Sequence, residues 1–289
     1  MTMQEKNLKV ISINKLKTAV EKIDNQNKIK KNSQWYNLRP ILGYFNWAMF
    51  AILLGGREVG KSYSVTNFFV HQWKNKGIPF TWLRLTEKAA SKLLQNNAEK
   101  LVDPDLRRKY DLDLVTNGNN VYEVTKRTKP DKNGKTKILE KKLMARVYAL
   151  STFYNDKGSI FDKDFLDDPN MRYNVAVDEF EREKGEKNTF NILYSLVNQL
   201  ENLLRSSKER VRIFFLGNTL EEASDILCAF NFIPESFGIF KLKSKRCVIH
   251  NIAPTEEYKI SKVFFSHFSR SNSSIPTLYL ILGSSKKSL

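Results

Sequence analysis

One eight-residue segment constrains the fold of this chain more than any other. Residues 55–62 read GGREVGKS and fit the phosphate-binding pattern G-x-x-x-x-G-K-[ST] at every fixed position. An apolar run at residues 47–54 precedes it, and residues 63–73 carry apolar side chains at helical spacing. Strand, glycine-rich loop and helix is the arrangement that this pattern requires. The segment therefore predicts an α/β fold with a mostly parallel central sheet flanked by helices.

The residue types of this segment suit the phosphates of a nucleotide. Its glycines let the backbone turn so that successive N–H groups point inward, and the following helix adds the positive end of its dipole. Lys61 would reach the β- and γ-phosphates, and the Ser62 hydroxyl would hold Mg²⁺. We therefore expect ATP and Mg²⁺ as cofactors, the alternative being a turn without ligand. The predicted nucleotide-binding residues are Gly55, Gly56, Arg57, Glu58, Val59, Gly60, Lys61, Ser62 and Tyr63.

Two later apolar runs end in polar residues. Residues 174–179 read NVAVDE, and we expect Asp178 to hold Mg²⁺ through water and Glu179 to polarise the attacking water. Adjacent side chains at a strand end point to different sides, which is compatible with two roles. The run 211–216 leads to Asn218, which would sense the γ-phosphate or cap the next helix. Upstream of the phosphate loop, the aromatic segment 35–36 would stack on adenine or pack in the core.

The charge of the chain predicts a polyanionic partner or an anionic surface, the alternative being a merely soluble basic protein. Lys and Arg number 48 against 31 Asp and Glu, a formal net charge of +17. Part of the surplus lies in residues 126–137, between two strand-like runs, where Asp, Asn and Gly favour a turn. A basic hairpin of this kind would follow a DNA phosphate backbone, or it is a solvated loop. The candidate DNA-binding residues are Lys126, Arg127, Lys129, Lys132, Lys135 and Lys137.

The remaining composition limits the classes of protein. Cys228 and Cys247 are the only cysteines and match no metal-ligand spacing, which indicates a reduced intracellular setting. No apolar run is long enough to span a bilayer and the amino terminus lacks a signal core, so we expect neither membrane association nor secretion. We divide the chain into a basic N-terminal arm or helix (1–34), an ATPase domain (35–240) and a short basic C-terminal tail (241–289).

Three segments together resemble a known family. They are residues 55–63 (GGREVGKSY), 178–184 (DEFEREK) and 209–218 (ERVRIFFLGN). In this order and spacing they are similar to the DNA-packaging ATPases, or encapsidation proteins, of small short-tailed phages with protein-primed genomes. Arg57, inside the phosphate loop, is also similar to an arginine of phage packaging motors, and we group it with Lys61 and Glu179 as catalytic. The resemblance covers roughly residues 35–235.

The resemblance implies a P-loop ATPase of the additional-strand, catalytic-glutamate class. Such a protein would form a homo-oligomeric ring, with a pentamer expected, and would dock on the portal of an empty capsid. It would use ATP to drive double-stranded DNA inward, working in the host cytoplasm and transiently at the portal vertex. Family members usually continue into a nuclease-like domain, whereas only residues 241–289 follow here, so we expect no second complete domain in this chain.

A cation that acts on the ATP of a neighbouring subunit is a further expectation. Arg205 ends the apolar helix expected over residues 189–205, which places a cation at the edge of the domain. Arg210 and Lys157 are the other candidates, and a surface arginine that complements a helix dipole is the alternative. Other functions that fit the sequence are a different DNA-linked P-loop translocase or loader, and a nucleotide-switched DNA-binding module.

Overall fold

The computed structural model describes the greater part of the chain. The described residues are 36–57, 59–131, 134–152, 171–180, 191–207, 210–218 and 224–253, without the side chains of 199, 200 and 202–207. All of them fall within the unit Met1–Ala253; the unit Pro254–Leu289 lies outside the described residues. The predicted N-terminal arm, Glu58, Lys132 and Lys157 also lie outside them.

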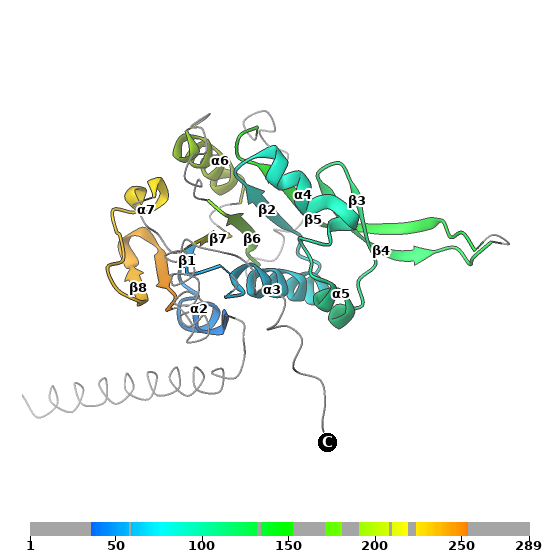
Figure 1. Cartoon of the computed structure of the whole chain (residues 1–289), viewed down its shortest axis with the longest axis horizontal. Coiled ribbons are helices and arrows are strands. Elements are labelled where there is room, and N and C mark those ends of the chain that lie inside the picture. The colour runs from blue at the N-terminus through cyan, green and yellow to red at the C-terminus, as the bar shows by residue number, and fades with distance from the viewer. Residues whose placement is uncertain are drawn as a thin grey trace, which may run out of the picture. The chain divides into compact units, whose positions relative to one another are not determined.

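The described part of the chain is built on one nine-stranded sheet (Figure 1). Its order is β3-β4-β5-β2-β6-β7-β1-β9-β8, and the pairs from β5 to β9 are parallel. Antiparallel pairs join β3, β4 and β5 at one side and β8 with β9 at the other. The strands are β1 (Phe50–Leu54), β2 (Phe80–Arg84), β3 (Leu114–Asn117), β4 (Asn120–Arg127), β5 (Ile138–Ala149), β6 (Tyr173–Asp178), β7 (Val211–Gly217), β8 (Gly238–Leu242) and β9 (Cys247–Asn251). The predicted α/β fold with a mostly parallel sheet is confirmed.

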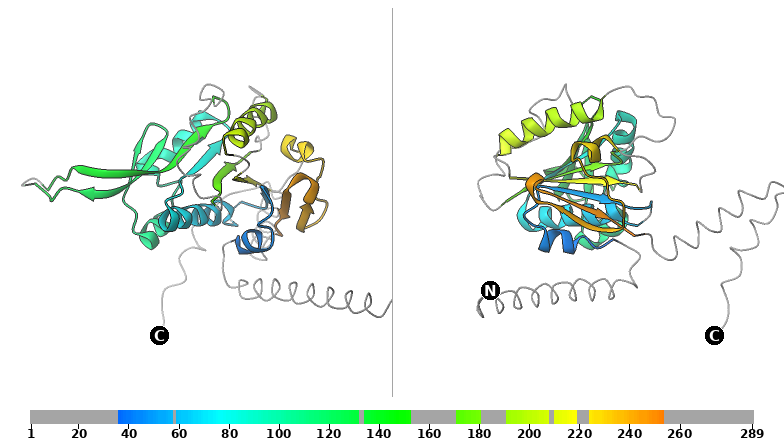
Figure 2. Two further views of the ribbon diagram at one scale, coloured as in Figure 1. Left: turned by 180° about the vertical axis from the view of Figure 1, so that it is seen from behind. Right: turned by 90° about the vertical axis from the view of Figure 1, so that its left-hand side faces the viewer.

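Helices cover both faces of the sheet (Figure 2). Alternate residues of β1 enter different core clusters, Ala51 and Leu53 on one face and Ile52 and Leu54 on the other. This burial on both faces explains why the strand reads as a continuous apolar run. The first cluster includes residues of α2 (Arg39–Tyr44), α3 (Lys61–Lys76), α4 (Glu87–Ala98) and α5 (Pro104–Tyr110), and the second includes residues of α6 (Ile192–Ser207) and α7 (Asp225–Ala229). None of these helices combines the length and apolar character that a membrane crossing requires.

The structure describes residues at both ends of the predicted ATPase domain (35–240). Tyr36 packs in the core, and its hydroxyl lies 2.8 Å from Nδ1 of His250. At the other end the sheet runs past residue 240, because β9 pairs with β1 in parallel and β8 flanks β9. The apolar stretch of β9 is only Cys247, Val248 and Ile249, and the basic residues before it hide the strand pattern. The first part of the predicted tail therefore belongs to the sheet.

The predicted basic hairpin is formed by β4 and β5, whose outer ends extend beyond the neighbouring strands (Figure 1). Its base is fixed to α3 through Glu123, which is buried. One carboxylate oxygen of Glu123 accepts from Trp73 Nε1 at 2.5 Å, and the other lies 2.7 Å from Lys74 Nζ. Because a buried carboxylate is stable only when paired and hydrogen-bonded, these contacts hold the hairpin base in one place.

The contact between Gly217, which ends β7, and Phe180, which follows β6, allows a test of the packing. A Cβ atom on Gly217 would lie 2.8 Å from the ring of Phe180, a buried residue. We expect Gly217→Ala to lower the free energy of unfolding by about 1–3 kcal/mol, because the ring and strand must move apart. Gly43→Ala in α2 is the matched control, since nothing lies within 4 Å of its Cβ position. Urea unfolding measures both variants, and equal stability of the two would contradict this packing.

Candidate nucleotide-binding site

The phosphate loop follows β1 and leads into α3, as the sequence predicts. Gly60 caps the helix with a φ of +80°, a left-handed conformation that glycine adopts without strain. Lys61 is only 8% exposed, and its Nζ donates to the carbonyls of Gly55 at 2.7 Å and Gly56 at 2.8 Å. The ammonium group is therefore held inside the loop, where a phosphate of a bound nucleotide would meet it.

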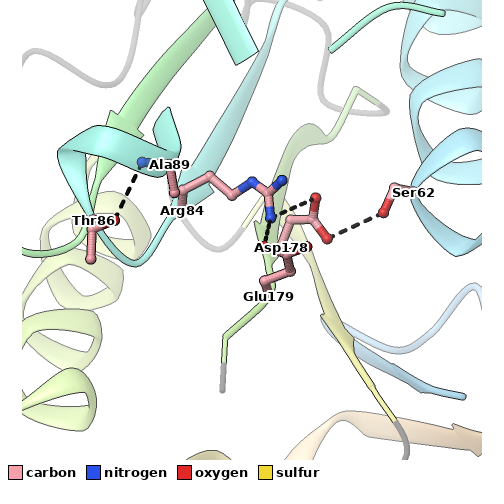
Figure 3. A network of polar contacts seen from close by, with 6 residues as sticks. All are labelled: Ser62, Arg84, Thr86, Ala89, Asp178 and Glu179. Atoms are coloured by element: carbon pink, nitrogen blue, oxygen red, sulfur yellow. Dashed lines mark hydrogen bonds and ion pairs between the residues drawn. The ribbon is translucent and has the colours of Figure 1, made fainter. Parts of the chain in front are cut away.

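The predicted metal-binding residues lie together. Ser62 Oγ, in the first turn of α3, donates to Asp178 Oδ1 at the end of β6 over 3.2 Å (Figure 3). A hydroxyl facing a carboxylate supplies the oxygen ligands that Mg²⁺ prefers, so the residues fit this ion. Within the described ranges, no group of three or more His, Cys, Asp or Glu side chains could hold a metal by itself. A magnesium ion here would therefore take its other ligands from phosphates and water.

Burial dominates the electrostatics of Asp178. Removal from water raises the pKa of this carboxyl, and the neighbouring Glu179 raises it further. Arg84 and the hydrogen bond from Ser62 oppose the shift. A buried carboxylate that is only partly compensated is a favourable place for a divalent cation.

Arg84 joins the two carboxylates, and the sequence analysis assigned it no role. It ends β2, the strand beside β6, and its Nη1 lies 3.6 Å from Asp178 Oδ2 and in close ion-pair contact with Glu179 Oε2 (Figure 3). Its side chain is 14% exposed. Thr86 fixes the turn after it by accepting from Ala89 N at the start of α4. In the sequence Arg84 stands out only as a cation at the end of a predicted strand. Its contact with the carboxylates follows from the pairing of β2 with β6, which the sequence does not reveal.

Glu179 differs from Asp178 in exposure and in backbone conformation. Its side chain is 63% exposed, against 8% for Asp178. Its φ is +52°, a left-handed value that is uncommon for residues other than glycine, and its N–H donates to Leu216 O at 2.9 Å. The strand therefore ends at Asp178, and the chain turns so that the second carboxylate faces solvent and Arg84. Uncommon backbone conformations of this kind cluster at functional sites.

A pocket of about 370 Å³ lies beside these groups. Ser62, Arg84, Asp178 and Glu179 line one part of it. Leu93 of α4, Leu106 of α5 and the connection between these two helices also line it, together with Tyr63, Thr66 and Trp82. The candidate site is thus a hollow with both carboxylates in its wall.

The other predicted site residues differ in their exposure to solvent and in their contacts. Arg57 is exposed, Val59 is buried, and Tyr63 and Asn218 are intermediate. Arg205 lies within α6, its side chain outside the described residues, and Arg210 lies directly before β7. In the hairpin, Lys126, Lys129, Lys135 and Lys137 are exposed. Arg127 instead forms a bidentate ion pair with Asp113, Nε to Oδ2 at 2.5 Å and Nη2 to Oδ1 at 2.9 Å.

Arg84 can be tested by its effect on folding. We expect Arg84→Met to cost roughly 3 kcal/mol, because it leaves the Asp178 carboxylate buried without its cation. The cost should be much smaller in an Asp178→Asn background and nearly unchanged in a Glu179→Gln background, since exposed ion pairs contribute little. Denaturant unfolding of the two double-mutant cycles measures this. Equal costs in both backgrounds would show that Arg84 does not compensate Asp178.

The sequence is similar to those of two phage proteins. The DNA packaging proteins of Bacillus phage PZA and Bacillus phage phi29 are each 24% identical to it over 207 residues, which is 70% of this chain and 52% of theirs. The chain thus spans about half the length of these relatives. No protein-family model matches the sequence.

Solved structures share the fold. The N-terminal domain of the DNA packaging ATPase from bacteriophage phi29 superposes with a TM-score of 0.57 at 22% identity, covering 78% of this chain and all of that domain. The phi29 packaging motor assembly gives 0.57 over 81% of this chain and 62% of its own, and the phi28 gp11 DNA packaging motor gives 0.54 at 15% identity over 84% and 69%. The chain is thus similar in sequence to the DNA packaging proteins of phages phi29 and PZA, and it shares the fold of the phi29 packaging ATPase N-terminal domain.

Proposed function

We propose that this chain is the ATPase of a motor that moves double-stranded viral DNA into a preformed capsid. The observation that carries the proposal is the assembly of Lys61, Ser62, Asp178 and Glu179 at one edge of the sheet, in a chain related to packaging proteins. ATP and Mg²⁺ are the proposed cofactors. A homo-oligomeric ring, with a pentamer expected, and the portal of the procapsid are the proposed assembly and partner, in the host cytoplasm and transiently at the portal vertex.

The residues divide the chemistry between them. Lys61 and the loop N–H groups bind the phosphates, and Ser62 and Asp178 hold the metal, which when bound neutralises charge on the transferred phosphoryl group. Glu179 orients and polarises the attacking water. In the structure only Oε2 of Glu179 contacts Arg84 and the side chain is 63% exposed, so the carboxylate can accept from a water while this contact is kept.

The assigned roles predict different outcomes for two variants. Lys61→Ala should abolish nucleotide binding or turnover, because the phosphates lose their cation. Glu179→Gln should keep binding, since the metal residues remain, while the hydrolysis rate falls by about 10²–10⁴. Nucleotide titration and phosphate release measure the two properties separately. Native turnover by Glu179→Gln would show that another group is the base.

The motor function is tested with DNA and capsids. Hydrolysis should rise with double-stranded DNA and rise further when procapsids with portals are added. If DNA stimulates hydrolysis equally with and without procapsids, the chain is instead a different DNA-linked translocase or loader.

The exposed hairpin lysines are the proposed DNA contacts. We expect binding to be independent of sequence and to weaken steeply with salt, because phosphate contacts release counterions. Lys135→Gln with Lys137→Gln should reduce the slope of log K against log salt by up to about 2. Lys88→Gln with Lys92→Gln on exposed positions of α4 is the matched control for net charge. Identical slopes for the two double variants would make the hairpin a solvated turn.

Arg205 is proposed to act on the ATP of a neighbouring subunit, with Arg210 and Lys157 as the other candidates. An arginine that stabilises transition-state charge in this way contributes about 10³–10⁵ in rate. Arg205→Ala should bind ATP and fail to hydrolyse it. When mixed with Glu179→Gln subunits it should regain activity, because some interfaces then join an intact arginine to an intact base. Co-assembly without any recovered activity would rule out this role.

A further inference from the structure

Three arginines gather at the amino-terminal edge of the central strands. Arg172 directly precedes β6, Arg212 is the second residue of β7, and Arg246 directly precedes β9. The parallel register pairs Tyr173 with Val211, and Phe50 with both Ile213 and Cys247, so the three arginines share one edge. Arg212 lies five residues, or roughly 16 Å, from the carboxyl end of β7. This arginine cluster is therefore at the opposite end of the sheet from the phosphate loop.

The cluster surrounds the loop between α2 and β1. Arg172 Nη1 donates to the carbonyls of Asn46 at 2.5 Å and Ala48 at 3.5 Å. Arg212 Nη2 donates to Asn46 Oδ1, and its guanidinium carbon lies 6.0 Å from the ring centroid of Phe68. The carbonyl of Arg246 accepts from Met49 N at 2.8 Å. The loop thus contacts the side chains of Arg172 and Arg212 through neutral groups, and it contacts the backbone of Arg246.

The charges of the cluster oppose one another. Burial, and to a lesser extent the charge of Arg172, lower the pKa of Arg212, which is 8% exposed, to about 10. Burial and then Arg246 lower the pKa of Arg172. In the part of the chain that the structure describes, neither Arg172 nor Arg212 forms an ion pair with an acidic side chain. Charges that are taken from water and repel each other gain most from a bound anion.

The surface next to the cluster is basic as well. Lys241 Nζ lies 5.2 Å from the ring centroid of Phe45, which directly precedes Asn46. Lys243 and Lys245 follow in the exposed turn between β8 and β9. A single small anion would meet only the arginines, whereas a chain of phosphates would meet the arginines and these lysines together. The planar guanidinium group also matches two phosphate oxygens at once.

We propose that Arg172, Arg212 and Arg246 form a second phosphate site, which binds a backbone phosphate of a double-stranded nucleic acid. The proposal rests on the proposed function in one respect, that nucleic acid is the partner. The site is separate from the hairpin, because β5 and β2 lie between β4 and the first strand of the cluster, β6. It is also separate from the nucleotide site at the other edge, so its loss should leave basal ATP hydrolysis unchanged.

The test compares two double variants of equal net charge. Arg172→Gln with Arg246→Gln removes two cations from the cluster and leaves the most buried arginine in place, and Lys88→Gln with Lys92→Gln is the control. Binding of a 30-base-pair DNA duplex and of the corresponding RNA duplex is measured across a salt series. We expect the cluster variant to reduce the salt slope by up to about 2 and the affinity at 0.1 M salt by up to about tenfold per contact. Arg172→Lys with Arg246→Lys keeps the charge and should restore part of the affinity.

The outcomes separate the possible sources of the phosphate. A loss on DNA alone, on RNA alone or on both supports the site and identifies its ligand. Inorganic phosphate provides an independent measurement, since it should raise the melting temperature of the native chain more than that of the cluster variant. If the cluster and control variants bind both duplexes equally, the proposal is overturned. If the native chain binds neither duplex, the nucleic-acid partner of the proposed function fails instead.

Discussion

The parallel pairing of β6 with β7 and of β7 with β1 is the constraint on which the candidate site depends. Its register places Asp178 beside Leu216 and Leu54 beside Gly217, so the three strands end at the same edge. The phosphate loop leaves β1 at this edge and the two carboxylates leave β6 there. The Ser62–Asp178 hydrogen bond then joins segments that are 116 residues apart in the chain. Phe180, packed against Gly217, fixes the turn that follows the carboxylates.

The two edges of this sheet carry different sets of charged side chains. The carboxyl-terminal edge holds buried Asp178 and exposed Glu179 with a single arginine between them, an arrangement suited to a metal ion and its phosphates. The amino-terminal edge holds Arg172 and Arg212, whose side chains contact neutral loop groups, and Arg246, whose charge acts on Arg172, an arrangement suited to an anion. Because side chains at opposite ends of a strand do not compete for space, one sheet can hold both kinds of site.

Helix α3 contacts two of the regions to which we assign function. Lys61 and Ser62 stand at its amino terminus, and Trp73 and Lys74 in its last turns hold Glu123 at the base of the hairpin. The hairpin in turn presents exposed lysines beyond the neighbouring strands. The nucleotide site and the proposed DNA contacts are therefore connected by one packed helix, whose buried face includes Val65, Phe69 and Val70.

The sequence by itself determined the phosphate loop, the strand ending in Asp178 and Glu179, the α/β class and the basic hairpin. These features are local, since the spacing of glycines, apolar runs and charges within a few residues specifies them. Tertiary structure decided what depends on strand order. Arg84 meets the carboxylates only because β2 lies beside β6, and Arg127 is neutralised only because Asp113 lies beside it. The short strand β9 joins the sheet because β1 offers it a parallel partner, and the arginine cluster exists because β6, β7 and β9 begin at one edge. Contacts between residues far apart in the chain have no local pattern, so packing alone revealed them.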